Sequence, residues 1–569
     1  MRSIKAYIQA LIVISLTLTF SNVQAATPAE IEQQKAIWRR LEQAEEAKRQ
    51  QDEEQARLNE PNVSLQQAKK RKKIIELPEE EVSFHIKEIV IQSPSPYTFP
   101  WLKKLVLPYK DKKIGVEGIN LIAQMLTERI IDKGYVTTQI TIPEQDLTTG
   151  TLILQVIPGT ISNIRFLQPN NWGSWRTAFP TKKDKILNIK SLEQGLEQMK
   201  RVPNQDVKME LVPGEQLGQS DVVIQLKRTK PWSISFSLDD SNLKSTGRLQ
   251  TSANITIYNP TGLNDTLNYS YGQDAEGQSS KHGNKNYSLS YSIPYGNYTF
   301  NISKYRSHFY QTVPSMIPFK SSNEIETFEL GVQKLLYRDK TTKTQASFKI
   351  MTRDRRSFID DIEILVQRQN TTAFQLGLMH RKYLGQGSLD LMLNYQRGVP
   401  WFGAKRGIGD GEPDMPTSHY DLVSLNIYFA TPFKIGTVAT RYNFTLRGQY
   451  SNDILYSSEQ FSIGGRYSVR GFDGEQTLAA ENGFYIRNEL SFPLKKLPVE
   501  IYAGVDYGHV WGPSDTYLPG RQLVGTVLGL RGNLLKQLQF DCFIGTPIYK
   551  PKGIKTAKTA LGFQIYLSF

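Results

Sequence analysis

The sequence predicts a transmembrane β-barrel of about 16 antiparallel strands over residues 230–569. Beyond Lys230, apolar residues alternate with Ser, Thr, Asn, Gln and Gly in segments such as WSISFSL, YSLSYSI and VSLNIYF, and this period of two is typical of strands with two unlike faces. Four of the 28 tyrosines precede residue 231, so the other 24 lie in the last 339 residues, as expected for the aromatic girdles of a membrane barrel. The chain also stops on an alternating segment, GFQIYLSF.

The length of this region separates the barrel from a soluble β-sandwich. A sandwich domain does not need about 340 residues of unbroken alternation. Strands of about 9–11 residues, with their turns and loops, use about 21 residues each, which gives around 16 strands. In the last segment Phe563, Ile565, Leu567 and the terminal Phe569 share one apolar face. This face suits the closing strand of a barrel in lipid and an exposed recognition signal for the barrel-assembly machinery.

The N-terminus has the features of a secretory signal peptide. Arg2 and Lys5 precede an apolar run from Ile8 to Phe20, and SNVQA then places Ala25 at a small-residue cleavage site. We expect residues 1–25 to be removed, because this apolar run is a poor spanning helix. No internal run of about 18 apolar residues follows, which argues against helical membrane spans.

Composition and charge argue against several classes of binding partner and of chemistry. The formal charge is +14, or +12 after the loss of Arg2 and Lys5. In an exported chain, this excess of positive charge indicates anionic surfaces or an acidic polypeptide as binding partners rather than nucleic acid. Cys542 is the only cysteine, so no intramolecular disulfide forms, and we interpret it as a small apolar filler. The six histidines and the absence of GxSxG, HExxH and Walker A motifs favour neither an enzyme nor a metal, nucleotide or other cofactor site.

Residues 26–60 are predicted to form a long N-terminal helix. Residues 29–59 contain neither Gly nor Pro, and Thr27 and Pro28 stand where an N-cap and a first helical residue belong. At 1.5 Å per residue this segment would make a rod of roughly 46 Å. Its apolar residues are too sparse for a core-forming stripe, so we expect the helix to be either solvated or sheltered inside a polar cavity. Residues 61–82, bounded by prolines and rich in charge, are interpreted as a linker.

Residues 83–159 and 160–229 repeat one β-α-β-β pattern. The first copy has the strand FHIKEIVIQ, the helix GINLIAQMLTERIIDKGY with Gly134 as its C-cap, and the strands VTTQITIP and TLILQVIPG. The second copy has TISNIRFLQ, the helix SLEQGLEQMKRV, and the strands DVKMELVPG and SDVVIQLKR. Units of this size predict two small α+β domains. A chance resemblance between two ordinary α+β domains is the alternative.

The segment QFSIGGRYSVRGFDGEQ, residues 460–476, holds four glycines and two arginines in a loop between YNFTLRG and FYIRNELSF. Two strands further on, alternation in VEIYAGVDYGHVW divides the residues between the two faces. The apolar, lipid-facing set is Val499, Ile501, Ala503, Val505 and Tyr507. Asp506 therefore points into the lumen, where Gly504 and Gly508 leave space for another backbone to approach. A lumenal carboxylate is tolerated and can accept a guanidinium bidentately, whereas a lipid-facing charge would cost several kcal/mol.

The whole chain resembles the two-partner secretion transporters. These are the hemolysin activators and filamentous-hemagglutinin transporters, with the contact-dependent inhibition transporters among them, in the superfamily of POTRA-bearing outer-membrane barrels. The resemblance rests on the order of the segments and on the loop. There Val469, Arg470, Gly471 and Phe472 match the family's VRGF motif, after Gly464, Gly465 and Ser468. It implies POTRA-like domains over residues 83–159 and 160–229, a plug helix in the barrel lumen, and pairing of Arg470 with Asp506. The alternatives are a solvated Arg470 and a helix that lies free in the periplasm.

The resemblance also implies a function. It implies an outer-membrane pore, expected as a monomer, that translocates a large secreted partner without local ATP use. The partner would carry an N-terminal secretion domain and could be a hemolysin, an adhesin or a contact-dependent growth-inhibition toxin. Two other functions stay open: a passive porin, which needs neither the two modules nor a threaded helix, and a barrel-assembly factor, which usually has more modules and no plug. An Arg–Asp pair lacks a nucleophile and a tunable base, so catalysis is not implied.

Overall fold

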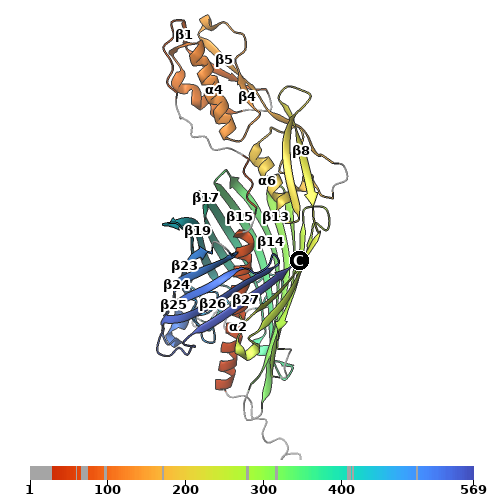
Figure 1. Ribbon diagram of the computed structural model, residues 1–569, viewed down its shortest axis with the longest axis vertical. Helices are drawn as coiled ribbons and strands as arrows, with labels where there is room; N and C mark the ends of the chain where they lie inside the picture. The colour runs from red at the N-terminus through yellow and green to blue at the C-terminus, as the bar shows by residue number, and fades with distance from the viewer. Residues whose placement is uncertain are drawn as a thin grey trace, which may run out of the picture.

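The structure is a computed structural model that describes residues 28–58, 61–65, 75–94, 99–168, 172–276, 281–313, 318–405, 412, 415–494 and 497–569. Within the first segment, the side chains of residues 37–52 are described. The expected signal peptide and its cleavage site at Ala25 lie outside these residues. Figure 1 shows two small α+β domains and a large barrel along the long axis of the molecule, with a long helix among the barrel strands.

Within the described segments sixteen antiparallel strands close into a barrel, which confirms the predicted fold class. They are β9 (Trp232–Asp239), β10 (Gln250–Tyr258), β11 (Thr266–Asp274), β12 (His282–Tyr295), β13 (Tyr298–Val313), β14 (Phe319–Arg338), β15 (Thr342–Ile359), β17 (Gln369–Leu384), β18 (Gly387–Val399), β19 (Asp421–Ile435), β20 (Val438–Ser451), β23 (Asn482–Pro493), β24 (Val499–Trp511), β25 (Gln522–Asn533), β26 (Leu538–Tyr549) and β27 (Ala560–Ser568). Short elements at their ends are β16 (Ile362–Glu363), η4 (Lys244–Thr246), η5 (Leu365–Gln367) and η6 (Pro513–Tyr517). The last strand, β27, closes the ring by pairing with β9.

Alternate residues of each barrel strand face lipid and lumen. On β24, Ile501 and Val505 are exposed while Tyr502 and Asp506 are buried, as the alternation predicts. Cys542 on β26 is exposed and lies opposite Phe563 of β27, so it does not fill a core.

Several barrel strands are longer than the 9–11 residues that a crossing strand needs. The longest, β14, has 20 residues. The extra length carries outward-facing charged pairs, such as Lys304 Nζ and Glu326 Oε1 at 2.8 Å and Lys320 Nζ and Asp361 Oδ1 at 3.1 Å. Charges on the outer face are destabilising at the bilayer midplane and are tolerated near the interfaces, so these strand ends extend toward the aqueous side.

The first α+β domain packs a long helix on a three-stranded sheet. Its elements are β1 (Ser83–Ile86), β2 (Glu88–Gln92), η1 (Pro100–Leu102), α3 (Lys103–Val106), η2 (Leu107–Tyr109), β3 (Lys112–Gly115), α4 (Val116–Asp132), β4 (Gln139–Thr141), η3 (Leu147–Thr149) and β5 (Thr151–Ile157). Ile119, Ile122, Leu126 and Ile130 of α4 are buried in one cluster, and Gly134 ends the helix region with a φ of 102°. The strand expected over residues 84–92 divides at Lys87 into β1, which pairs with β3, and β2, which pairs with β5.

The second domain has the same sheet topology as the first. Its elements are β6 (Thr160–Phe166), α5 (Trp175–Ala178), α6 (Ile189–Lys200), β7 (Gln205–Pro213) and β8 (Gln219–Arg228). The order β6-β8-β7 matches β2-β5-β4, and in each sheet the first strand runs parallel to the central one. Leu192, Leu196 and Met199 of α6 are buried against this sheet, which fits the helical face that the sequence indicates.

This second domain sits on one rim of the barrel. Trp172 Nε1 donates to the Asn259 carbonyl at 2.8 Å, Arg201 Nη2 donates to Ser292 Oγ at 2.6 Å, and the Gly296 amide donates to the Thr177 carbonyl at 2.7 Å. The barrel residues in these contacts lie in or near the hairpin turns β10–β11 and β12–β13. These turns therefore mark the rim that faces the two α+β domains.

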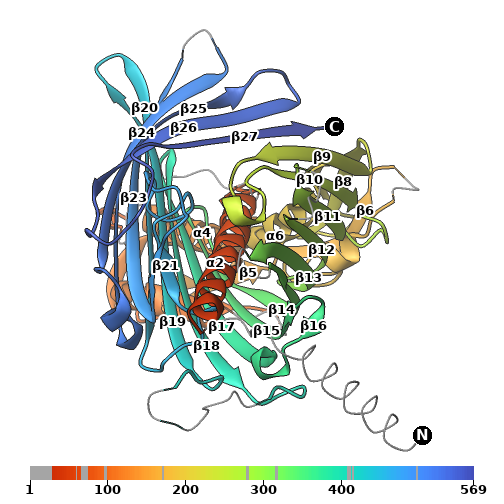
Figure 2. The same cartoon turned by 90° about the horizontal axis from the view of Figure 1, so that it is seen from below.

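The long helix α2 (Pro28–Leu58) runs inside the barrel. Seen from the rim opposite the two domains, it crosses the interior and the strands surround it (Figure 2). Within the described residues no helix combines the length and the apolar character that a membrane-crossing helix requires. Side chains of α2 contact the inner wall of the barrel at β9, β13, β14 and β15.

Candidate functional site: an inward loop and a lumenal helix

The glycine- and arginine-rich loop folds into the barrel. Between β20 and β23 the chain forms β21 (Phe461–Ile463) and β22 (Leu478–Ala480), which pair with each other. The loop and the wall share an apolar cluster made of Phe461, Ile463, Val469, Phe472, Leu478, Ala480, Tyr485, Val510, Leu523 and Ile554. Val469 is fully buried and Phe472 is 3% exposed. The two apolar residues of the VRGF motif thus anchor the loop on both sides of its arginine.

Arg470 and Asp506, whose pairing the resemblance to two-partner secretion transporters implies, are in contact. Arg470 Nε lies 2.7 Å from Asp506 Oδ2, and Nη2 lies 2.9 Å from Oδ1, so the guanidinium donates bidentately. The Arg470 amide also donates to Asp506 Oδ2, at 3.0 Å. Arg470 is 4% exposed and Asp506 is fully buried. The carboxylate therefore fixes both the side chain and the main chain of the loop.

Glu489 of β23 is a third member of the cluster and was missed in the sequence. Arg470 Nη1 donates to its Oε2 at 2.5 Å, and Arg531 Nη1 of β25 lies 2.8 Å from its Oε1. Arg531 Nε also donates to Glu500 of β24 at 2.5 Å. The cluster therefore has two guanidinium groups and three carboxylates. An arginine stays protonated in proteins, so this arrangement can position and hold a segment.

The wall beneath the loop is lined with glycine. A Cβ on Gly504 would lie 2.7 Å from Arg470 Nη2, and one on Gly508 would lie 2.7 Å from Val469 Cγ2. Two further glycines, Gly525 of β25 and Gly545 of β26, were not singled out in the sequence. A Cβ on Gly525 would overlap the Arg470 carbonyl oxygen, and one on Gly545 would lie 2.8 Å from the Gly471 Cα. Four glycines on three neighbouring strands thus let the loop backbone lie against the wall.

We expect Gly525→Ala to displace the loop and to lower both the stability of the barrel and secretion. The new methyl group would overlap the Arg470 carbonyl, and the wall and the loop cannot both keep their positions; overpacking of this kind costs about 1–3 kcal/mol. Loop protection from protease and the temperature of barrel unfolding measure the effect. The matched control is Gly448→Ala on β20, where the nearest atom to the added Cβ lies at 3.6 Å. Equal unfolding temperatures for the two variants would contradict the tight fit.

The remaining glycines of the motif serve turns. Gly464 has a φ of 107° and Gly471 a φ of 103°, which is the left-handed region that favours glycine. Ser468 Oγ accepts from the Gly464 amide at 3.1 Å and from the Gly465 amide at 3.4 Å. The hydroxyl therefore closes the turn that leads into Arg470.

The loop also reaches the seam where the barrel closes. Arg466 Nη1 lies 3.1 Å from Asp240 Oδ1, just after β9, and 3.2 Å from the Phe563 carbonyl of β27. Asp240 in turn accepts from the Phe563 amide at 2.8 Å. On the far side of the loop, Asp473 accepts from Thr556 Oγ1 at 3.0 Å. These contacts connect the loop to the first and last strands, and the sequence alone does not show them.

The C-terminal residues of the predicted recognition signal lie at the same seam. Ile565 of β27 pairs with Leu238 of β9, and Leu567 pairs with Phe236. The Phe569 amide donates to the Ile234 carbonyl at 2.9 Å. Ile565 and Phe569 are exposed on the outer face.

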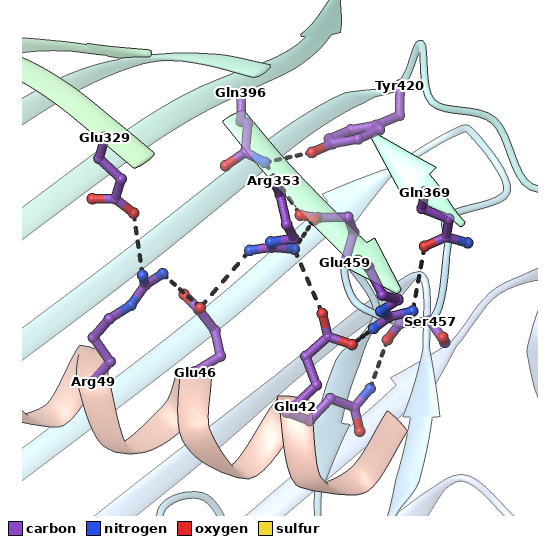
Figure 3. Close-up of polar contacts among 12 residues, drawn as sticks. Glu42, Glu46, Arg49, Glu329, Arg353, Gln369, Gln396, Tyr420, Ser457 and Glu459 are labelled. Carbon is purple, nitrogen blue, oxygen red and sulfur yellow. Dashed lines mark hydrogen bonds and ion pairs between the residues drawn. The ribbon is translucent and has the colours of Figure 1, made fainter. Parts of the chain in front are cut away.

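Helix α2 is held by polar contacts with the barrel wall (Figure 3). Glu42 pairs with Arg355 of β15, and Glu46 Oε2 lies 4.0 Å from Arg353 Nη2. Arg49 Nη1 lies 3.2 Å from Glu329 Oε1 of β14. Spacings of three and four residues place these helix side chains on one face, toward β14 and β15.

Other faces of α2 reach other parts of the wall. Lys48 Nζ donates to Asp239 Oδ2 of β9 at 3.0 Å, and Glu45 accepts from Ser307 Oγ of β13 at 2.8 Å. Gln43 Nε2 donates at 3.0 Å to the carbonyl of Ser457, in the same long loop that holds Arg470. Within residues 37–52 of α2, two apolar side chains are buried, Trp38 and Leu41, in a cluster with Leu243, Phe309 and Ile325. Beside the helix a cavity of about 610 Å³ remains, lined mainly by polar residues of the helix, the wall and the loop.

Fold and site together define a class of protein: a membrane barrel with two small domains on one rim, a helix through its lumen and an inward loop held by an arginine. Comparison with known proteins agrees. The family model "Haemolysin secretion/activation protein ShlB/FhaC/HecB" matches residues 218–532, a ShlB-type POTRA domain matches residues 84–159, and a POTRA domain matches residues 160–213. The chain belongs to this family of haemolysin secretion/activation proteins. It is therefore an outer-membrane transporter of the two-partner secretion class, and its POTRA domains lie in the periplasm.

Individual relatives match over most of the chain. Outer membrane transporter CdiB-2 of Burkholderia pseudomallei is 36% identical over 97% of this chain and 98% of its own length. Outer membrane transporter CdiB of Dickeya dadantii is 30% identical, over 82% of this chain and 83% of its own length. The solved structure of CdiB from Acinetobacter baumannii is 29% identical and superposes with a TM-score of 0.81, covering 92% of this chain and 98% of its own. For CdiB from Escherichia coli the TM-score is 0.82 at 26% identity, over 96% of this chain and 100% of its own.

Proposed function

We propose that the protein conducts a large secreted partner protein, in an unfolded state, through the barrel lumen to the cell surface after helix α2 has left the lumen. The observation that carries the proposal is the position of α2. The helix crosses the interior and contacts β9, β13, β14 and β15, so an extended polypeptide and the helix compete for one space. A rod of roughly 46 Å exceeds the hydrocarbon core of roughly 30 Å, so α2 is long enough to plug the pore from rim to rim.

The nature of the contacts favours a plug that can leave. Most contacts of residues 37–52 with the wall are ion pairs and hydrogen bonds, which water in an open lumen can replace. The carboxylates in these pairs are mostly buried, with Asp239 2% and Glu329 5% exposed, and rehydration of both partners when the helix leaves offsets much of the attraction that is lost. A helix held mainly by such contacts can be released more easily than one buried in an apolar core.

Partner recognition is assigned to the POTRA domains. The end strands of the two sheets are β2 and β4 in the first domain and β6 and β7 in the second. An unfolded segment can add to an end strand through main-chain hydrogen bonds, which tolerate varied sequence. The partner would carry an N-terminal secretion domain. A contact-dependent growth-inhibition toxin is favoured over a hemolysin, because the CdiB transporters are 30–36% identical to this chain whereas the hemolysin transporters ShlB and HpmB are 29% and 28% identical.

The sequence holds no Walker A motif, so we assign transport without local ATP use and with folding of the partner outside the cell as the source of direction. The protein acts as a monomer that the barrel-assembly machinery inserts through β27 and the terminal Phe569. It is not an enzyme, and nucleic acid is not a partner.

A reversible cross-link between the helix and the wall tests the proposal. In a Cys542→Ser background, cysteines replace Glu45 on α2 and Ser307 on β13, whose side chains are hydrogen-bonded. A short reducible bis-methanethiosulfonate reagent joins them. We expect secretion to stop on cross-linking and to return on reduction, because the helix can no longer leave.

The two single-cysteine variants are the controls, and each should secrete normally with the reagent present. Secretion at the normal rate through cross-linked protein would show that α2 is not a plug and would overturn the proposed function. If the protein were a barrel-assembly factor, the cross-link would instead lower the surface level of other barrel proteins and would not act on one secreted partner alone.

A further inference from the structure

A short part of the predicted linker is held at the junction of the second POTRA domain and the barrel. Val63 is 8% exposed, whereas its neighbours Asn62 and Ser64 are exposed. Val63 belongs to the apolar core cluster of the second POTRA domain, together with Leu192 and Leu196 of α6. The linker therefore gives one side chain to a folded core, which its charge-rich composition does not indicate.

The main chain on both sides of Val63 is bound by buried charged side chains. Arg338, at the end of β14, donates from Nη2 to the Val63 carbonyl at 2.8 Å. The Leu65 amide donates to Glu193 Oε1 of α6 at 2.7 Å. Arg338 is 7% exposed and Glu193 is 2% exposed. One residue of the barrel and one of the POTRA domain thus bind a carbonyl and an amide of the same extended segment.

Further polar side chains hold Arg338 in place. Arg338 Nη1 donates to Gln194 Oε1 at 2.8 Å, and its Nη2 also donates to Glu197 Oε2 at 3.0 Å. Lys343 of β15 donates to Glu197 Oε1 at 2.5 Å. Burying charged groups costs several kcal/mol per ion unless they are paired and hydrogen-bonded. Four charged side chains from two domains are concentrated here around a linker of five described residues, residues 61–65.

These contacts describe a site for an extended peptide. It binds one carbonyl and one amide of the main chain, and it takes one small aliphatic side chain while the adjacent side chains point outward. Recognition of this kind depends little on sequence, as in strand addition. The site lies between the second POTRA domain and the ends of β14 and β15, on the rim through which a polypeptide from the periplasm enters the barrel.

We propose that this site is an exchangeable peptide subsite, which the linker occupies in the resting state and an extended segment of the secreted partner occupies during transport. The inference rests on the proposed function. The occupying segment needs an aliphatic residue such as valine at the central position, with no charge there. Because residues 61–65 follow α2 after Leu58, displacing them also releases the attachment that keeps the plug helix near the lumen. Arrival of the partner and loosening of the plug thus occur at one place.

Thiol labelling of the linker tests the exchange in the full chain. In a Cys542→Ser background, Val63→Cys places a small thiol in the apolar site, and Ser64→Cys places one on the exposed neighbour. We expect a water-soluble maleimide to label the thiol at position 63 at least about tenfold more slowly than the thiol at position 64 in resting protein, because labelling at position 63 requires local opening. During secretion of the cognate partner in cells, labelling at position 63 should rise severalfold while labelling at position 64 stays constant.

A second part of the experiment, the peptide arm, uses a synthetic peptide in place of the secreted partner. The heptapeptide EPNVSLQ, a copy of residues 60–66, is added at well above about 1 mM to the purified full chain, since a tethered segment has an effective concentration of order millimolar. Labelling of the Val63→Cys variant should rise severalfold with this peptide and stay flat with EPNDSLQ, whose aspartate cannot enter the apolar site.

The outcomes separate this inference from the proposed function. If the thiol at position 63 is labelled as fast as the thiol at position 64 in resting protein, or if it stays protected while the partner is being secreted, the exchange is wrong although transport stands. Equal effects of the two peptides would also overturn it. If no partner reaches the cell surface even with unmodified protein, the proposed function fails, while the peptide arm still reports on the site.

Discussion

Arg470→Ala is expected to abolish secretion and to release the inward loop from the barrel wall. The substitution leaves Asp506, which is fully buried, and Glu489, which is 8% exposed, without the guanidinium that joins them. Removing one partner from a buried ion pair costs about 3–5 kcal/mol, because the remaining charge is uncompensated. The hydrogen bond from the main-chain amide of residue 470 to Asp506 would then be the one polar contact left between them, which is too little to hold the loop on the wall.

Two measurements follow the release of the loop. Limited proteolysis at residues 464–477 should become fast, and the folded barrel should lose its resistance to heat in detergent electrophoresis. Arg470→Lys should be intermediate, because an ammonium cannot donate bidentately to Asp506 while also reaching Glu489. Normal secretion by Arg470→Ala with the loop still protected would contradict a latch.

A neutral triple variant separates stability from transport. Arg470→Met with Glu489→Gln and Asp506→Asn removes the buried charges together, which is often neutral for stability. If this variant folds but does not secrete, the ion pair acts in transport; if it folds and secretes, the pair only stabilises the loop. A simple exchange of Arg470 and Asp506 is a poorer control, because an aspartate at position 470 would face Glu489.

Alternation along single strands made part of the site predictable. The period of two is fixed by strand geometry, so the apolar set on β24 was enough to place Asp506 in the lumen, with Gly504 and Gly508 on the same face. The two repeated modules were predictable for the same kind of reason, since their helices and strands each show a clear period. The total of sixteen strands followed from the length of the alternating region.

Contacts between distant strands were not predictable in this way. Glu489, Gly525 and Gly545 reach the loop because of the register between β23, β24, β25 and β26, and one sequence does not show that register. The contact of Arg466 with Asp240 depends on closure of the barrel between strands at opposite ends of the domain. The burial of Val63 was not predictable for a different reason. The charge-rich composition of the linker indicates a solvated segment, yet Val63 packs into a folded core.

Deleting residues 28–58 is expected to raise the single-channel conductance of the purified barrel severalfold. A helix with its side chains is about 10–12 Å across, and a barrel of 16–18 strands leaves an aqueous channel when nothing fills it. In the intact protein the helix occupies this space, with a cavity of about 610 Å³ beside it, so conductance should be low and should show rare openings. High and steady conductance in the intact chain would instead support a passive porin.

The barrel should survive this deletion because wall charges that contact α2 also have partners within the wall. Arg353 would keep Glu459, whose Oε1 lies 2.7 Å from its Nη1, and Glu329 would keep Lys349, whose Nζ lies 3.2 Å from its Oε2. The wall charges therefore stay partly paired within the wall itself. Unchanged migration of the folded barrel in electrophoresis checks this directly.

A milder variant tests whether the ion pairs hold the plug. Glu42→Gln with Glu46→Gln keeps the helix but removes its charge pairing with Arg355 and Arg353. We expect openings to become more frequent while the conductance of each opening equals that of the deletion, because the same pore is exposed each time. If the double variant gates like the intact protein, the ion pairs do not retain the plug, and the packing of Trp38 and Leu41 against Phe309 and Ile325 must hold it.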